Sequence, residues 1–248
     1  MLRGATGMTE TSVKSYSRAV GILLVLSMVG GFFGEMYVPS LMLADNAVAT
    51  AAQLRTNEGL FRLGFAAYLA EAVSDIVLAW LFYVILKPVN RELALLSAFF
   101  GLVSTTLFAV TKMFYFAAPM FVGGSKYLTA FSPEQLDAFA TLFLSLYGAL
   151  SGLTMLFYGI PWIIRGYLTY KSNYLPRGLG LLMILAGVAF VAKTLTYVLV
   201  PAYSSDFLLA PMFLNAMAVA IWMLIHGVNE DKFAKSARRE PGSAPLPT

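Results

Sequence analysis

Charged residues that could form a functional site lie inside long apolar stretches of the sequence: Glu35, Glu71, Asp75, Lys112 and Lys193. A charge within a lipid bilayer is costly and usually faces the interior of a helix bundle, so each of these residues is a candidate. Glu71 and Asp75 are four residues apart and would share one face of a helix. Because the signs are mixed, the carboxylates and ammonium groups can stay charged if they pair and form further hydrogen bonds.

Polar side chains extend this group of charges. Tyr68 lies three residues before Glu71, and Tyr197 lies four residues after Lys193. Other hydrogen-bonding groups on the apolar stretches are Thr105, Tyr115, Thr194 and Asn215. At a helical rise of about 1.5 Å per residue, the charges lie roughly 18–31 Å from the basic residues that flank the stretches. We therefore predict a ligand or ion pocket, open to the outer face, that the charges form with Tyr68, Tyr197 and Asn215.

Three functions are compatible with such a pocket. The leading hypothesis is a non-enzymatic membrane protein that binds or passes a small polar solute, an ion or a proton. The alternative is a structural or regulatory membrane subunit whose charges are salt bridges that fix helix packing. An intramembrane enzyme is disfavoured, because the sequence has no Gly-x-Ser-x-Gly and no His-Glu-x-x-His motif. Ser104 and Lys112 form a conceivable Ser–Lys pair, but nothing in the sequence positions them.

Residues that usually bind metals are scarce in this chain. It has no cysteine, which excludes disulfides, thiolate metal sites and cysteine nucleophiles. His226 is the single histidine, so no histidine cluster can form. Glu71 and Asp75 could hold one divalent ion together, but two carboxylates make a thin site. We expect no catalytic residue, no metal and no cofactor.

The composition indicates an integral membrane protein. The 248 residues are 59% hydrophobic and 12% charged, whereas soluble domains carry about 25% charged residues. The apolar residues gather in six blocks: Ala19–Leu43, Leu60–Leu86, Leu93–Val122, Leu136–Ile164, Leu179–Val200 and Phe207–Ile225. Crossing a hydrocarbon core of about 30 Å takes about 20 helical residues. The predicted fold is therefore all-α, a polytopic bundle of six transmembrane helices.

Lysine and arginine predict the orientation of this bundle. One set of connections and both ends of the chain hold twelve of them: Arg3, Lys14, Arg18, Lys87, Arg91, Arg165, Lys171, Arg177, Lys232, Lys235, Arg238 and Arg239. The other connections hold only Arg55, Arg62 and Lys126. The positive-inside rule then predicts that both termini are in the cytoplasm. The membrane that we expect the bundle to cross is the plasma (inner) membrane. The same arrangement explains the pI near 9.2, so we expect the lipid bilayer as a partner and no nucleic acid.

The chain divides into three predicted parts. Residues 1–18 would be a cytoplasmic N-terminal segment, residues 19–228 the transmembrane domain, and residues 229–248 a disordered cytoplasmic tail rich in charge, proline and small residues. A short surface helix is expected between Asp45 and Glu58, and a capping box at residues 132–135 should start the fourth spanning helix. Gly30, Gly31 and Gly34 predict a face of close helix packing.

Several short segments together resemble a known family. They are NEGLFRLG at residues 57–64, LKPVNR at 86–91, SPEQL at 132–136 and YLPR at 174–177, with Leu95-Leu96 and Gly166-Tyr167-Leu168 between them. This combination is similar to the six-pass bacterial family catalogued as domain of unknown function 4386 (DUF4386), over about residues 20–227. The resemblance implies a bacterial membrane protein. It supplies no reaction, substrate or catalytic residue.

Overall fold

The structure is a computed structural model in which residues 10–124 and 126–238 are described. These residues form an all-α bundle with six helical spans long and apolar enough to cross a membrane, which confirms the predicted fold class. The spans run over Val13–Met42, Glu58–Leu86, Arg91–Val122, Pro133–Lys171, Arg177–Leu199 and Asp206–Ile225. The protein is therefore a multi-pass membrane protein.

The first and last spans are composite, and short helices lie at both ends of the bundle. The elements are α1 (Glu10–Gly31), the π-helical turn η1 (Phe32–Tyr37), α2 (Val38–Met42), α3 (Ala47–Thr56), α4 (Glu58–Leu86), α5 (Arg91–Val122), the 3₁₀ turn η2 (Lys126–Leu128), α6 (Pro133–Lys171), α7 (Arg177–Leu199), the 3₁₀ turns η3 (Pro201–Tyr203) and η4 (Asp206–Leu209), α8 (Ala210–Ile225) and α9 (Glu230–Ala237).

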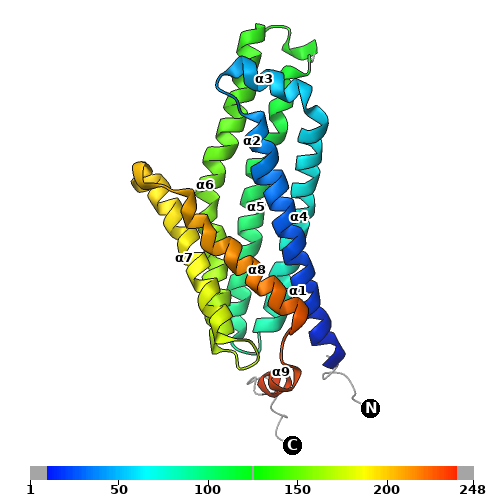
Figure 1. Cartoon of the computed structure of the whole chain (residues 1–248), viewed down its shortest axis with the longest axis vertical. Helices are drawn as coiled ribbons and strands as arrows, with labels where there is room; N and C mark the ends of the chain where they lie inside the picture. The colour runs from blue at the N-terminus through cyan, green and yellow to red at the C-terminus, as the bar shows by residue number, and fades with distance from the viewer. Residues whose placement is uncertain (1–9, 125, 239–248) are drawn as a thin grey trace, which may run out of the picture.

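The spanning helices form a closed ring. Each packs against the span that precedes it in the chain, and α8 packs against both α7 and α1, which joins the last span to the first. Figure 1 shows α8 crossing the bundle obliquely to reach α1, while α3 covers the opposite end from α9. With 16 residues, α8 is much shorter than the 39-residue α6. It therefore closes only the half of the ring that lies toward α9.

Side-chain caps fix where several helices begin. The predicted capping box is present: the Ser132 hydroxyl accepts a hydrogen bond from Gln135 N, and the Gln135 side chain accepts one from Ser132 N. Asn46 accepts from Ala49 N at the start of α3, as expected for the short surface helix. Asn90 caps α5 in the same way. These bonds satisfy N–H groups that lack a partner within the helix.

Glycine allows two pairs of helices to approach closely. A Cβ atom on Gly34 would lie 2.5 Å from the Gly64 carbonyl oxygen, so the predicted glycine face packs α1 and η1 against α4. The α6–α7 hairpin uses glycines at a seven-residue spacing, with Gly159 opposite Gly187 and Gly166 opposite Gly180. Their backbones touch, since a Cβ on Gly187 would lie 2.6 Å from the Gly159 carbonyl oxygen. Contacts of this kind replace hydrophobic collapse as the packing force within lipid.

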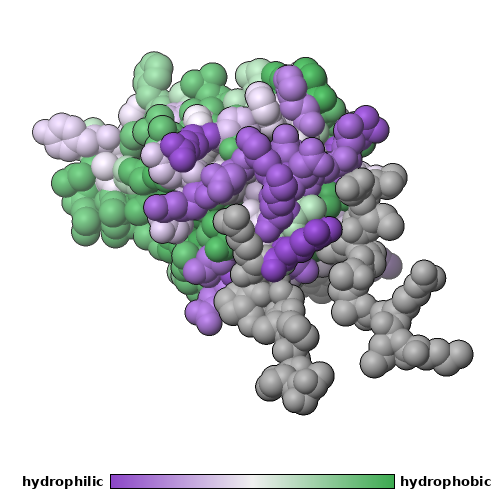
Figure 2. Space-filling view, turned by 90° about the horizontal axis from the view of Figure 1, so that it is seen from below, coloured by the Kyte–Doolittle hydropathy of each residue, from purple (hydrophilic) through white to green (hydrophobic). Residues whose placement is uncertain are grey.

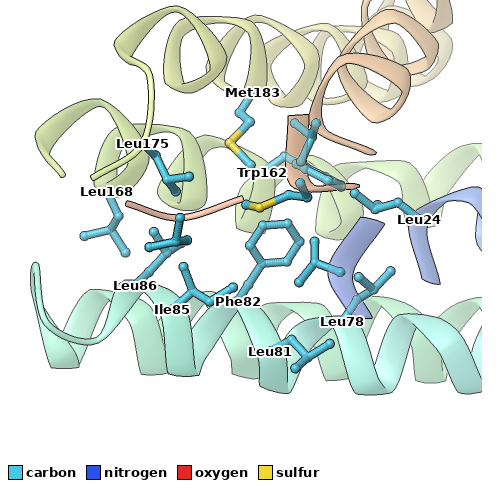
Figure 3. Packing of buried hydrophobic residues seen from close by; sticks show 14 of the residues in the cluster. Leu24, Leu78, Leu81, Phe82, Ile85, Leu86, Trp162, Leu168, Leu175 and Met183 are labelled. Atoms are coloured by element: carbon cyan, nitrogen blue, oxygen red, sulfur yellow. The ribbon is translucent and has the colours of Figure 1, made fainter. Parts of the chain in front are cut away.

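Two separate apolar cores fill the bundle. The larger core lies toward α9 and joins α1, α4, α6, α7 and α8. Figure 3 shows Phe82 and Ile85 of α4 facing Trp162 of α6 and Met183 of α7 in this core. The smaller core lies toward α3 and includes Met42, Leu54, Phe61, Tyr115 and Tyr147. Between the two cores the interior is not fully packed, as described below.

The ends of the chain differ from the prediction. Residues 230–237 form helix α9, so the predicted disordered tail is wrong for this segment, and residues 239–248 lie outside the described residues. Phe233 is buried and packs edge-on against Tyr174, with ring centroids 5.3 Å apart, which anchors the segment. Helix α1 begins at Glu10, inside the predicted N-terminal segment. Figure 2 shows hydrophilic residues gathered at this end of the molecule, bordered by hydrophobic ones.

The glycine contact between α6 and α7 predicts a large difference between two glycine substitutions in α7. Gly187→Ala would press a methyl group against backbone atoms of α6, which cannot move aside cheaply, and should cost about 1–3 kcal/mol of stability. Gly178→Ala meets no atom within 4 Å and serves as the matched control. Thermal unfolding in detergent should show a lower midpoint for Gly187→Ala alone. Equal midpoints for the two variants would contradict this packing.

Candidate functional site

A cavity of about 510 Å³ lies inside the helix ring, between the two apolar cores. Residues from every spanning helix contribute to its wall. They are Leu24, Ser27, Met28, Gly31, Phe32, Glu35, Met36, Tyr68, Glu71, Ala72, Asp75, Thr105, Phe108, Tyr147, Gly148, Ser151, Met155, Tyr158, Trp162, Phe190, Asp206, Leu209, Met212, Phe213 and Ala216. This volume is typical of small-molecule sites, which occupy about 300–1,000 Å³.

The structure brings four of the predicted site residues to this cavity: Glu35, Tyr68, Glu71 and Asp75. Glu35 comes from the π-helical turn η1, which interrupts the first span. Such turns are frequent at functional sites, because the extra residue changes the direction of the side chains. Glu71 and Asp75 share the inner face of α4, as their spacing predicted.

Lys112 lies behind the wall, at the side of Glu35. It is 1% exposed, and its Nζ lies 3.4 Å from Glu35 Oε1. The same Nζ donates to the Tyr147 hydroxyl at 2.7 Å and to the Gly34 carbonyl at 3.3 Å. It also lies 4.4–5.1 Å from the ring centroids of Tyr68, Tyr115 and Tyr147. Ion pairing and cation–π contacts together compensate for the burial of this ammonium group.

The two carboxylates of α4 differ in the number of hydrogen bonds that they accept. Asp75 accepts a hydrogen bond from the Ser27 hydroxyl at 2.9 Å and another from the Tyr158 hydroxyl at 3.3 Å. In contrast, Glu71 Oε2 is buried with no hydrogen-bond partner. The Tyr68 hydroxyl, one turn away, is also buried and unpartnered. A buried polar atom without a partner costs about 1–3 kcal/mol, so these two atoms mark a place where a ligand or water is needed.

Arg165 is a buried charge that the sequence analysis missed. The sequence assigns it to the basic residues at the membrane surface, but it is 5% exposed, and its Nε donates to the Ser97 hydroxyl at 3.1 Å. Its guanidinium lies over the rings of Phe82 and Trp162 at 4.8 and 5.4 Å. The predicted fourth apolar block ends at Ile164, one residue before Arg165, and so leaves Arg165 outside the membrane span. The spacing of Tyr158, Trp162 and Arg165 on one helix face could have revealed it.

A second, small cavity separates Arg165 from Asp75. Its volume is about 20 Å³, and Ser104, Thr105 and Tyr158 also line it. A site needs about 10–15 Å³ and two to four polar partners to hold one water molecule, and both conditions are met here. The Arg165 guanidinium therefore offsets the negative charge of Asp75 across this small cavity, without a direct ion pair.

Besides Lys112, three predicted site residues are not part of the cavity wall. Lys193 Nζ pairs with Asp206 Oδ1 at 2.7 Å, and the Asp206 side chain is 90% exposed at the rim. Tyr197 packs against Gly152 of α6. Asn215 is fully buried, and its side-chain nitrogen donates to the Met212 sulfur at 3.8 Å. The sequence predicts how far along its helix each of these residues lies. It does not predict the direction in which the side chain points around the helix axis, and these three side chains do not line the cavity.

The cavity opens through the side of the bundle and not through the α3 end, where the sequence predicts its mouth. On the α3 side it is closed by the smaller core, and the Arg55–Asp137 ion pair at 2.7 Å ties α3 to α6 above that core. The exposed wall residues are Phe32 and Met36 of η1, Gly148 of α6, and Asp206 and Phe213 beside and on α8. The opening therefore lies between the first span and α6, where α8 no longer closes the ring.

The fold and the cavity together define a polytopic α-helical membrane protein with an acidic interior. The chain belongs to the family described as Domain of unknown function (DUF4386), whose model matches residues 19–227. This confirms the resemblance seen in the sequence. An uncharacterized protein from Archaeoglobus fulgidus is 23% identical over 155 residues, which cover 62% of this chain and 78% of the relative. No solved structure matches the chain.

The unequal burial of the two intramembrane lysines predicts unequal costs when they are removed. Lys112→Met leaves Glu35 without its partner and should cost about 2–4 kcal/mol of unfolding free energy. Lys193→Met removes a pair whose acidic partner is exposed, so the cost should stay below about 1 kcal/mol. Unfolding of both variants in the same detergent measures the difference. Similar losses of unfolding free energy for the two variants would contradict the greater cost expected for removing the buried Lys112.

Proposed function

We propose that this protein is a non-enzymatic membrane protein that binds, and in doing so can pass, a small solute with a polar or charged group in the central cavity. The observation that carries this proposal is the pair of buried, unpartnered atoms, Glu71 Oε2 and the Tyr68 hydroxyl, in the wall of a 510 Å³ cavity. The Tyr115 hydroxyl, Thr169 Oγ1 and Asn215 Oδ1 are also buried without partners, but only Glu71 and Tyr68 among these residues line the cavity, where a bound solute could supply the missing partner.

The chemistry of the wall favours binding over catalysis. Ser104, the one candidate nucleophile considered beside Lys112, donates to the Gly101 carbonyl at 2.8 Å and lies in the small cavity instead. In residues 10–124 and 126–238, no group of three histidine, cysteine, aspartate or glutamate side chains is placed to hold a metal. The proposal accordingly includes no cofactor and no catalytic residue.

The orientation in the membrane is also a proposal. The end of the bundle that carries α9 would face the cytoplasm, with both termini there, in the plasma (inner) membrane. Without the buried Arg165, the sequence still has eleven lysines and arginines on this side against three on the other. Such an excess is the usual mark of the cytoplasmic face.

The alternative function, a structural or regulatory subunit, is favoured by a different observation. The Glu35–Lys112 and Arg55–Asp137 pairs each join separate parts of the chain. They would hold the bundle together whether or not a solute enters. This alternative predicts a dry interior, whereas a binding site in this cavity requires access for water and solute.

Cysteine labelling separates a wet cavity from a dry core, because the chain has no cysteine of its own. Ser151→Cys places a thiol in the cavity wall, and Leu153→Cys places one on the same helix at a position that is 42% exposed and outside the wall. A small cationic methanethiosulfonate reacts with ionised thiols in water. In proteoliposomes we expect it to modify the Ser151→Cys variant at least tenfold faster. Equal rates, or a slower rate at this position, would favour the structural alternative.

Solute binding should then slow this labelling. The solutes to compare are Na⁺, K⁺, propylamine and glycerol, each in the Ser151→Cys protein with Glu71 or with Glu71→Gln. We expect at least one charged solute to protect the thiol, and we expect Glu71→Gln to remove that protection. Glu58→Gln is the matched control, since Glu58 pairs with Arg62 in an exposed i,i+4 ion pair outside the cavity. If no solute protects the thiol, the proposed binding function fails.

A further inference from the structure

The cavity is divided into an acidic side and an apolar side. Three of its four acidic residues come from η1 and α4, and the fourth, Asp206, begins η4 at the rim. The apolar side comes from the other helices and is formed by Phe108, Met155, Trp162, Phe190 and Met212. A molecule that fills such a cavity must have one polar end and one apolar end, because a hydrophilic molecule would leave the aromatic and thioether groups without contacts.

The charge on the acidic side is not balanced within the wall. All charged residues in the described wall are acidic: Glu35, Glu71, Asp75 and Asp206. Two of them have a lysine partner, Lys112 for Glu35 and Lys193 for Asp206. Asp75 receives two hydroxyl hydrogen bonds. Glu71 remains without a cation or a donor on Oε2, so its carboxyl group is the place for a donor-bearing cation.

A second atom points to the same place. Tyr68 is 3% exposed and lines the cavity one turn from Glu71, and its hydroxyl has no hydrogen-bond partner. An ammonium group has several N–H donors and no acceptor. It could therefore donate to the Glu71 carboxylate and to the Tyr68 hydroxyl oxygen together. A carboxylate or phosphate head group would instead place like charges side by side.

The position of the opening indicates how such a molecule arrives. The rim lies on the side of the bundle and combines the 90% exposed Asp206 side chain with the exposed apolar residues Phe32, Met36 and Phe213. The exposed apolar part of this rim suits the hydrocarbon core, whereas the exposed Asp206 carboxylate requires water, so the opening reaches both the bilayer and its aqueous interface. Amphipathic molecules concentrate in the bilayer, with their polar ends at its interface, so a side opening admits them directly.

From these observations we infer that the ligand is an amphipathic amine, which enters from the bilayer between the first span and α6. Its ammonium group binds Glu71 and Tyr68, and its apolar part packs against the Phe108 and Trp162 side of the cavity. This inference rests on the proposed function and adds to it the chemical class of the solute and its route.

Trp162 offers a direct probe of occupancy, because it lies in the apolar part of the wall. The other tryptophans, Trp80 and Trp222, are outside the wall and can be replaced in a Trp80→Phe/Trp222→Phe protein. Bromine quenches tryptophan fluorescence on contact. The probes are an eleven-carbon primary amine with a terminal bromine and the alcohol of the same chain, both added to the full-length protein in lipid nanodiscs.

We expect the brominated amine to quench Trp162 with saturation, and the brominated alcohol to give only the weak, linear quenching of a lipid-dissolved molecule. Glu71→Gln should raise the half-saturating amine concentration at least tenfold, whereas Glu58→Gln should leave it unchanged. Tyr68→Phe should raise it about threefold and provides a second variant if Glu71→Gln does not fold. Equal quenching by amine and alcohol, or saturation that is independent of both Glu71 and Tyr68, would overturn the inference.

The outcome also separates this inference from the proposed function. If propylamine or a metal cation protects the Ser151→Cys thiol but the long-chain amine does not quench Trp162, the cavity binds a small hydrophilic solute and the inference falls alone. If neither kind of molecule has an effect, both proposals fall.

Discussion

The bilayer leaves a buried charge few solutions, and the interior of this protein is organised around that constraint. A charge deep in a spanning helix is costly in lipid, so it faces the bundle interior and finds its partners on other spans or in a cavity. Here the ring of six spans supplies them from residues distant in sequence, as when Lys112 of α5 meets Glu35 of η1 and Tyr147 of α6. The pairing holds because α5 packs against both α4 and α6, while η1 packs against α4.

Pairing of this kind explains most of the interior charges, but not all. Glu35, Asp75, Lys112 and Arg165 each have a partner that offsets burial. Stability alone accounts for these contacts, and a structural subunit would need nothing more. Glu71 has no such partner on one oxygen, although it lies in the same wall. This difference between satisfied and unsatisfied carboxyl groups is what favours binding over scaffolding.

The features that depend on apolar length and composition could be predicted from the sequence. The features that depend on the direction of a side chain around its helix axis could not. Six spans follow from apolar length, and the start of α6 follows from its capping box. The position of each charge along its helix was also predicted from the sequence. The direction of the side chain around the helix was not, and Lys193 of α7 points to Asp206 and not into the cavity. The apolar block that ends at Ile164 predicts a surface position for Arg165, but α6 continues to Lys171 and buries this side chain. Helix α9 depends on Phe233 packing on Tyr174, which composition does not reveal.

The side opening follows from the same packing that closes the rest of the bundle. Close glycine contacts join α1 and η1 to α4, and α6 to α7, so each hairpin is tight within itself. The first span and α6 lie on opposite sides of the ring, and toward α9 they are joined through α8 and α7. Toward α3 the bridge is the smaller core and the Arg55–Asp137 pair. Between these two connections, no close glycine contact joins the first span to α6 in the described part of the chain, and the cavity opens there.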